Sequence, residues 1–138
     1  MEKKSIARIL FVIALMSAAR SAADDKLPSG GKRTIVLFGA SWCAPCRIEL
    51  RQLPALANAA EPDRLTVAWI DRAPPSYLIA SNLNVAVLSP GEASQRFQAV
   101  VGESGGLPVS VIIEGSRVCG ISRRPLTLQS LRALQNSC

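Results

Sequence analysis

Apolar residues fall into short consecutive runs and helical stripes, which together predict a single α/β domain. Residues 35–38 form an apolar run that ends at Gly39, a pattern typical of a strand buried on both faces. Apolar positions then recur at spacings of four and three, which predicts a helix with one buried stripe made of Cys46, Leu50, Leu53, Ala57 and Ala60. Pro54 removes a backbone donor within this helix, so we expect a kink close to it.

A second apolar run over residues 65–71 predicts another buried strand after that helix. Strand, helix and strand in this order imply a parallel, right-handed βαβ unit. Residues 71–84 contain two consecutive prolines and no regular period, so we expect a loop with about one helical turn. Ser89, Pro90 and Glu92 then form a helix start signal, and the predicted helix continues to about residue 101.

The C-terminal part predicts a hairpin followed by a final helix. Gly115 opens a two-residue turn between strands predicted at residues 109–113 and 118–121. Thr127 is a helix N-cap, Leu126 can pack back on the helix as a staple, and the buried face carries Leu128, Leu131 and Leu134. A mixed sheet with helices on both faces follows from this order of elements.

The first 23 residues have the pattern of a secretory signal. Basic residues at positions 3, 4 and 8 precede an apolar run over residues 9–18, and small residues precede a predicted cleavage site after Ala23. The alternative is an uncleaved membrane anchor, although an apolar run of this length is shorter than the ~20 residues that span a bilayer. We expect a mobile lead-in over residues 24–33, with room for at most one short strand, and a domain over residues 34–138.

Charge and composition exclude several classes of function. Without the predicted signal, the chain has 12 Lys and Arg against 9 Asp and Glu, a net charge of +3. Its basic residues are scattered and its aromatic residues are few, so a nucleic-acid partner is not expected. Histidine is absent, which excludes sites with histidine ligands, Cys/His nucleophile pairs and covalent haem attachment through C-x-x-C-H.

Four cysteines in an exported chain are expected to be paired or redox-active. Cys43 lies where the first strand meets the helix, and the free N–H groups at a helix start stabilise a thiolate. Cys43 is therefore the candidate nucleophile, and Cys46 the candidate resolving thiol. Pro45 fits the first helical turn because its missing N–H would have had no partner there. A zinc site formed by all four cysteines is an alternative, disfavoured by the eighteen residues between Cys119 and Cys138; we expect no metal and no other cofactor.

The segment over residues 38–50, with its Trp-Cys-Ala-Pro-Cys core, resembles the active-site segment of the thioredoxin superfamily. It is most similar to TlpA/ResA-like extracytoplasmic thiol-disulfide oxidoreductases, and Gly106-Leu107-Pro108-Val109 is the second matching segment. The resemblance implies a thioredoxin-like fold, with a mixed central β-sheet flanked by helices. The N-terminal part should be shortened, because the chain has no room for the full β-α unit that thioredoxins carry ahead of the active-site strand.

The resemblance also implies roles for residues near the two cysteines. Pro108 should be a cis proline that leaves the backbone of Leu107 free to pair with a substrate, and Trp42 should help to shape the docking surface. Cytoplasmic thioredoxin has a buried aspartate and lysine where this chain has Leu37 and Trp69. Trp69 is most simply a core residue. No obvious buried carboxylate is then left to accept the proton of Cys46, which leaves water, a substrate group or Glu49.

The main hypothesis is a periplasmic or otherwise extracytoplasmic disulfide reductase that acts on cysteines of exported proteins. The pair Ala44-Pro45 lacks the histidine of strongly oxidising relatives, and the resemblance implies a membrane thiol donor that keeps the dithiol reduced. The alternatives are a disulfide oxidase or isomerase, and an exported binding module in which Cys43 and Cys46 form an inert structural disulfide. Cys119 and Cys138 are expected to form a structural disulfide that ties the last helix to the last strand.

Overall fold

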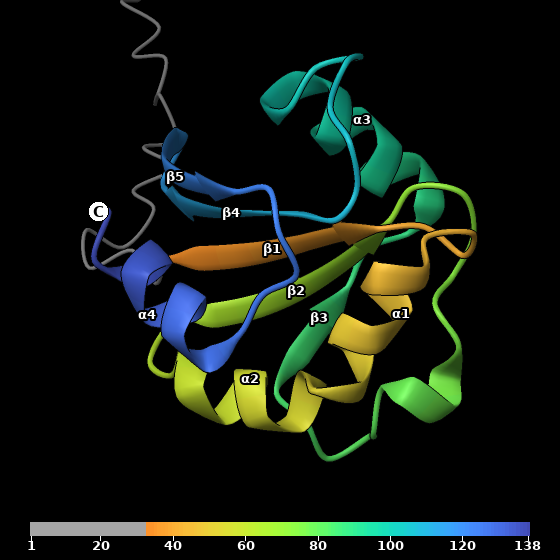
Figure 1. Ribbon diagram of the computed structural model, residues 1–138, viewed down its shortest axis with the longest axis horizontal. Coiled ribbons are helices and arrows are strands. Elements are labelled where there is room, and N and C mark those ends of the chain that lie inside the picture. The colour runs from red at the N-terminus through yellow and green to blue at the C-terminus, as the bar shows by residue number, and fades with distance from the viewer. Residues whose placement is uncertain (1–32) are drawn as a thin grey trace, which may run out of the picture.

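The computed structural model describes residues 33–138, in which five strands form one mixed sheet with helices on both faces (Figure 1). The order of strands across the sheet is β3-β2-β1-β4-β5. The predicted fold class, a mixed central sheet flanked by helices, is thus confirmed. The elements are β1 (Thr34–Gly39), α1 (Ala44–Arg51), α2 (Leu53–Ala60), β2 (Arg64–Trp69), the 3-10 turn η1 (Ser76–Leu78), β3 (Val85–Val87), α3 (Pro90–Val100), β4 (Val109–Glu114), β5 (Arg117–Ser122) and α4 (Leu128–Gln135).

The strand that precedes the cysteine pair lies at the centre of the sheet. β1 pairs in parallel with β2, from Thr34 opposite Arg64 to Gly39 opposite Trp69, and antiparallel with β4. Every residue of β1 after Thr34 is buried. The consecutive apolar run is therefore explained by burial on both faces of a central strand.

The two faces of the sheet have separate cores. Ile35 and Leu37 point to the face covered by α1, α2 and α4, where they pack with Leu50, Leu53 and Leu131. Val36 and Phe38 point to the other face and pack against α3, in which Phe97 meets the Phe38 ring edge-on at a centroid distance of 5.5 Å. Successive side chains of a strand point to opposite faces, so one strand supports both layers.

The predicted active-site helix is two helices. α1 ends at Arg51 and α2 begins at Leu53, and between them the Gln52 N–H donates to Glu49 and Leu50. Pro54 lies in the first turn of α2, where its missing N–H costs no helical hydrogen bond. The expected kink is thus a break just before the proline. It rotates the buried face, so that Leu56 is fully buried and Ala57 of the predicted stripe is only half-buried.

The sequence analysis missed one strand. β3 has only three residues, and it pairs in parallel with the outer side of β2, from Leu65 opposite Val85 to Val67 opposite Val87. The structure therefore completes this edge of the sheet with a segment that follows β2 in the chain. The expected loop before it contains η1, which is the single helical turn anticipated there.

Caps and turns lie where the sequence placed them. Ser89 and Glu92 form a reciprocal capping box at the start of α3. Thr127 caps α4, where Ser130 completes a second capping box. The β4–β5 turn has Gly115 at φ +62°, a conformation that favours glycine. These local signals are read directly from sequence because each depends on residues within four positions.

The predicted signal over residues 1–23, and all of the predicted lead-in except Arg33, lie outside the described residues. Between residues 33 and 138, none of the helices has the length and apolar character required to cross a bilayer.

Candidate active site

Cys43 caps the helix that follows the central strand. Its N–H donates to the carbonyl of Ala40 at 3.1 Å, and its own carbonyl accepts from Arg47 at 3.2 Å. Its sulfur accepts a hydrogen bond from the Cys46 N–H at 3.3 Å. A negative charge on this sulfur would be stabilised by that donor and by the positive end of the helix dipole. The arrangement favours a thiolate at Cys43 when the pair is reduced.

The two cysteines of the C-x-x-C segment form a disulfide, with their Cα atoms 5.3 Å apart. Cys43 is 4% exposed and Cys46 is 1% exposed, so a partner reaches Cys43 first. Ala40, Ile70 and Leu107 pack around the pair. The site is a nearly buried disulfide at the end of the central strand, with apolar surroundings on the protein side.

Leu107 and Pro108 come from a different part of the chain and meet the cysteine pair in space. The Leu107–Pro108 peptide bond is cis, and Pro108 is buried. Half-buried Leu107 precedes β4 and lies outside its ladder, which starts with Val109 opposite Phe38. Trp42 lies on the surface with 70% of its area exposed. The structure therefore brings Leu107 against the disulfide and leaves Trp42 facing solvent beside it.

The end of β1 is closely packed against Trp69 and Cys46. A Cβ atom on Gly39 would lie 2.6 Å from Trp69 Nε1 and 3.1 Å from Cys46 Cβ, so only glycine fits there without rearrangement. Trp69 is 2% exposed and belongs to the core. The expectation that Trp69 is a core residue is confirmed, and the glycine that bounds the apolar run has a packing role.

The loop before Cys43 is fixed by Asp71, which follows β2. Its carboxylate accepts hydrogen bonds from the Ser41 N–H at 2.9 Å and from the Ser41 hydroxyl. Partial desolvation raises the pKa of Asp71, but the hydrogen bonds from Ser41 outweigh it and hold the pKa below its ordinary value. An ionised Asp71 thus connects the ends of β1 and β2 beside the cysteine pair.

The sequence analysis was wrong that no obvious buried carboxylate lies near Cys46. Glu49 is 3% exposed, follows Cys46 by three residues and therefore lies on the same side of α1. Its carboxylate accepts a hydrogen bond from the Leu126 N–H at 2.5 Å. Burial raises the pKa of Glu49 to about 7, although the Leu126 hydrogen bond lowers it. A helical position beside a cysteine was the available signal, but the contact with Leu126 is not visible in sequence.

Glu49→Gln should stabilise the protein at alkaline pH and leave its stability unchanged in acid. The pKa of Glu49 rises on folding from 4.5 to about 7, so the folded state loses stability as pH rises through this interval. Each pKa unit corresponds to about 1.4 kcal/mol, which gives a gain of up to about 3 kcal/mol at pH 8 and none below about pH 4.5. Urea unfolding at both pH values measures it. The exposed Glu103→Gln is the control, and an equal gain at both pH values would contradict the assignment.

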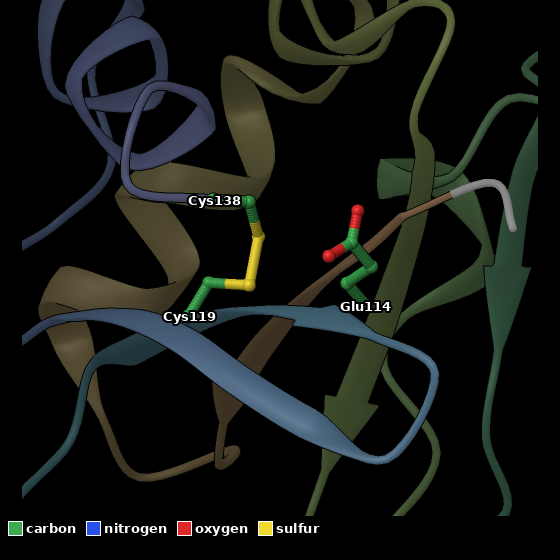
Figure 2. Close-up of side chains that lie close together, drawn as sticks. All are labelled: Glu114, Cys119 and Cys138. Atoms are coloured by element: carbon green, nitrogen blue, oxygen red, sulfur yellow. A yellow bond between two sulfur atoms is a disulfide. The ribbon is translucent and has the colours of Figure 1, made fainter.

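Cys119 and Cys138 form the second disulfide, with their Cα atoms 5.0 Å apart (Figure 2). It joins β5 to the segment after α4. Cys119 follows the turn of the β4–β5 hairpin, whose strand β4 pairs there with Thr34 at the start of β1, whereas Cys43 follows the end of β1. The two disulfides therefore lie at opposite ends of the sheet.

Among residues 33–138, Glu114, Cys119 and Cys138 place one possible ligand atom each within 4.8 Å of one another (Figure 2). Both sulfurs are used in the disulfide, and the Glu114 carboxylate pairs with Arg117 at 2.8 Å. The four cysteines are paired two by two, so they do not form the four-cysteine zinc site considered from sequence.

Replacing Cys119 and Cys138 together by serine should lower the free energy of unfolding and leave the Cys43–Cys46 site active. Closing a loop of this size, with the cysteines 19 residues apart, stabilises by roughly 3 kcal/mol through the entropy of the unfolded chain. Chemical denaturation of the double variant measures the loss. Unchanged stability would contradict a structural role for this disulfide.

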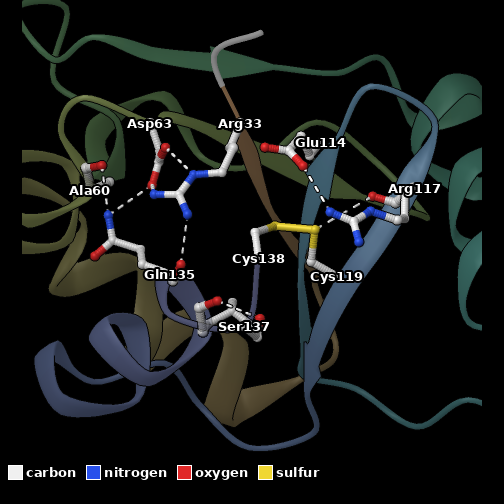
Figure 3. A network of polar contacts seen from close by, with 10 residues as sticks. Arg33, Ala60, Asp63, Glu114, Arg117, Cys119, Gln135, Ser137 and Cys138 are labelled. Carbon is white, nitrogen blue, oxygen red and sulfur yellow. Dashed lines mark hydrogen bonds and ion pairs between the residues drawn. A yellow bond between two sulfur atoms is a disulfide. The ribbon is translucent and has the colours of Figure 1, made fainter. Parts of the chain in front are cut away.

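A polar network lies near the second disulfide and connects three segments (Figure 3). The Arg33 guanidinium donates two hydrogen bonds of 2.9 Å to the Asp63 carboxylate and one of 2.7 Å to the carbonyl of Gln135. The Gln135 side-chain amide donates to the carbonyl of Ala60 and to Asp63. The network fixes the entry to β1 and the ends of α2 and α4, away from the cysteine site.

No protein-family model matches the sequence, and no curated protein matches it significantly. Three solved structures are similar over most of their length. StoA from Bacillus subtilis is 21% identical, with 79% of this chain and 86% of that chain covered and a TM-score of 0.56. A secreted Mycobacterium tuberculosis disulfide oxidoreductase is 15% identical, with coverage of 78% and 83% and a TM-score of 0.53. The thioredoxin domain of a thiol-disulfide oxidoreductase from Bacteroides vulgatus is 18% identical, with coverage of 77% and 79% and a TM-score of 0.56.

The agreement covers the sheet and its helices, and the neighbours are thiol-disulfide oxidoreductases of the thioredoxin superfamily. The chain therefore has the thioredoxin-like fold that the residues around Cys43 and Pro108 predicted.

Proposed function

We propose that this protein is a thiol-disulfide oxidoreductase whose working group is the Cys43–Cys46 pair. The observation that supports it most is the placement of Cys43 at the start of α1, where its sulfur accepts the Cys46 N–H. A cysteine in this position has a stabilised thiolate, and its partner is close enough to form an intramolecular disulfide. Fold neighbours described as disulfide oxidoreductases add support by analogy.

The reaction transfers two electrons from the reduced pair to a substrate disulfide. The Cys43 thiolate attacks one substrate sulfur, forms a mixed disulfide and releases the other sulfur as a thiolate. The Cys46 thiolate then attacks the Cys43 sulfur, closes the Cys43–Cys46 disulfide and releases the second substrate thiolate. The two released thiolates take up protons, and the substrate leaves as a dithiol.

Glu49 is the candidate acceptor for the proton of Cys46 in the second step. Its pKa of about 7 lets it take up and release a proton near neutral pH. It shares the buried side of α1 with Cys46 and is sheltered from bulk water. Of the three acceptors that the sequence left open, this one has support from burial and position.

Leu107, Pro108 and Trp42 form the proposed docking surface for the substrate. The backbone of Leu107 lies next to the disulfide and precedes the β4 ladder, so an extended substrate segment can pair with it as an added strand. Trp42 offers a large exposed aromatic surface on the same approach. The substrates in this proposal are exported proteins that contain cysteines.

The preferred direction in this proposal is reduction of substrate disulfides, in an extracytoplasmic compartment and with a membrane thiol donor. The helix start is the main charge-stabilising feature acting on Cys43, since the residues between the cysteines are Ala44 and Pro45. Equilibration of the domain with glutathione should give a reduction potential more negative than about −200 mV, near the range of thioredoxin. A potential close to about −120 mV would instead favour an oxidase.

The function is tested by trapping its intermediate. In a Cys46→Ser variant the second step is blocked, so mixed disulfides should accumulate through Cys43 and disappear on treatment with a reductant. Cys43→Ser/Cys46→Ser is the matched control and should form none. A Cys46→Ser protein that forms no adducts with disulfide-bonded proteins would overturn the proposal.

A further inference from the structure

The solvent side of α1 carries a feature that the proposed reaction does not use. Ala44, Arg47, Ile48 and Arg51 line a surface depression of about 290 Å³ on this helix. These positions recur at spacings of three and four, so they form one face, opposite the buried face that carries Cys46, Glu49 and Leu50. Ile48 is 55% exposed, which adds an apolar floor between two cationic side chains.

Neither guanidinium of this depression is used within the described chain. The ion pairs between residues 33 and 138 involve Arg33, Arg72 and Arg117, and the acidic residue of α1, Glu49, is buried and bonded to Leu126. Arg47 and Arg51 lie four residues apart on a helix, where like charges destabilise by about 0.2–0.5 kcal/mol. An acidic partner would remove this repulsion and complete the site.

The depression starts beside the candidate nucleophile. Ala44 follows Cys43 directly, and a helix rises 1.5 Å per residue, so Arg47 lies about 6 Å and Arg51 about 12 Å along the axis from Cys43. An extended peptide advances about 3.3 Å per residue. A substrate bound to Cys43 and running along α1 would place its second and fourth residues from the reactive cysteine opposite Arg47 and Arg51.

We propose that this face of α1 binds an acidic segment of the substrate, with Asp or Glu two to four residues from the reactive cysteine, and so selects acidic substrate sites. The inference rests on the proposed function, because it takes Cys43 as the point of attack. Arg47 and Arg51 are positioning residues that act on recognition and leave the chemistry at sulfur unchanged. Electrostatic attraction at the rim of a site acts chiefly on the rate of association.

The test compares three cysteine peptides that carry a chromophoric thiol in disulfide linkage. Their residues two and four positions from the cysteine are Glu, Gln or Lys, on either side of it in separate peptides. With the reduced wild-type protein at low salt, a Glu peptide should release the chromophore about tenfold faster than the Gln peptide. High salt should reduce this advantage, and an advantage that persists at 1 M salt would contradict an electrostatic origin.

The variant Arg47→Gln/Arg51→Gln should bring the Glu peptide to within twofold of the Gln peptide and leave the rate with the Gln peptide unchanged. Arg64→Gln/Arg132→Gln removes the same charge from exposed residues outside this depression, and it should retain the tenfold preference. Equal rates for all peptides with the wild-type protein would overturn this inference alone. If none of the peptides releases the chromophore, the proposed function itself fails.

Discussion

Cys43→Ser is expected to abolish reduction of substrate disulfides, with a rate loss of at least about 1,000-fold. A serine hydroxyl ionises far above neutral pH, so the hydrogen bond from the Cys46 N–H and the helix dipole cannot supply a nucleophile at this position. Cys46, which is 1% exposed, cannot replace it, because an incoming disulfide does not reach its sulfur. The rate of reduction of a disulfide-bonded peptide by the pre-reduced protein measures this loss.

The control for this experiment is the Cys119→Ser/Cys138→Ser protein, assayed where it remains folded. Its disulfide lies at the opposite end of the sheet from Cys43, so its rate should stay within about twofold of the wild-type rate. Activity that persists in Cys43→Ser, or that depends on Cys119 and Cys138, would contradict the assignment of the nucleophile.

Asp63→Ala should lower the free energy of unfolding by about 3 kcal/mol. The Asp63 side chain is 4% exposed and accepts hydrogen bonds from Arg33 and Gln135 (Figure 3). Its removal leaves a half-buried guanidinium without its carboxylate and frees the ends of α2 and α4. Urea unfolding monitored by the fluorescence of Trp69 measures the change.

Glu114→Ala is the matched control, because it also removes a carboxylate from an ion pair with arginine. The Glu114–Arg117 pair is exposed on both sides, so its loss should cost below about 1 kcal/mol. If the two variants lose equal stability, the network around Asp63 does not have the structural role assigned to it.

The local parts of the fold were predictable from sequence because their signals are local. The apolar run before Gly39 identified the central strand, and the capping residues Ser89 and Thr127 identified two helix starts. β3 was missed because three residues cannot show a period, and its pairing with β2 is a tertiary contact. The break at Gln52 was anticipated as a kink, but its effect on which side of the helix is buried depends on packing against α4.

Part of the site was predictable in the same way. The pattern around Cys43 and Cys46 identified the cysteine pair, and the resemblance at Pro108 pointed to the segment that packs beside it. Glu49 was underestimated because a glutamate in the first turns of a helix is usually solvated. Its burial results from the chain passing over it at Leu126, which is 77 residues away and cannot be read from the sequence pattern.

The most direct test of the central claim is to follow both cysteine pairs during a single turnover. The fully reduced protein is mixed with one equivalent of a disulfide-bonded peptide, quenched by alkylation and mapped by mass spectrometry. The account predicts that each peptide disulfide reduced is matched by one new Cys43–Cys46 disulfide. A peptide that stays oxidised, or one whose reduction leaves Cys43 and Cys46 as thiols while Cys119 and Cys138 become paired, would contradict it.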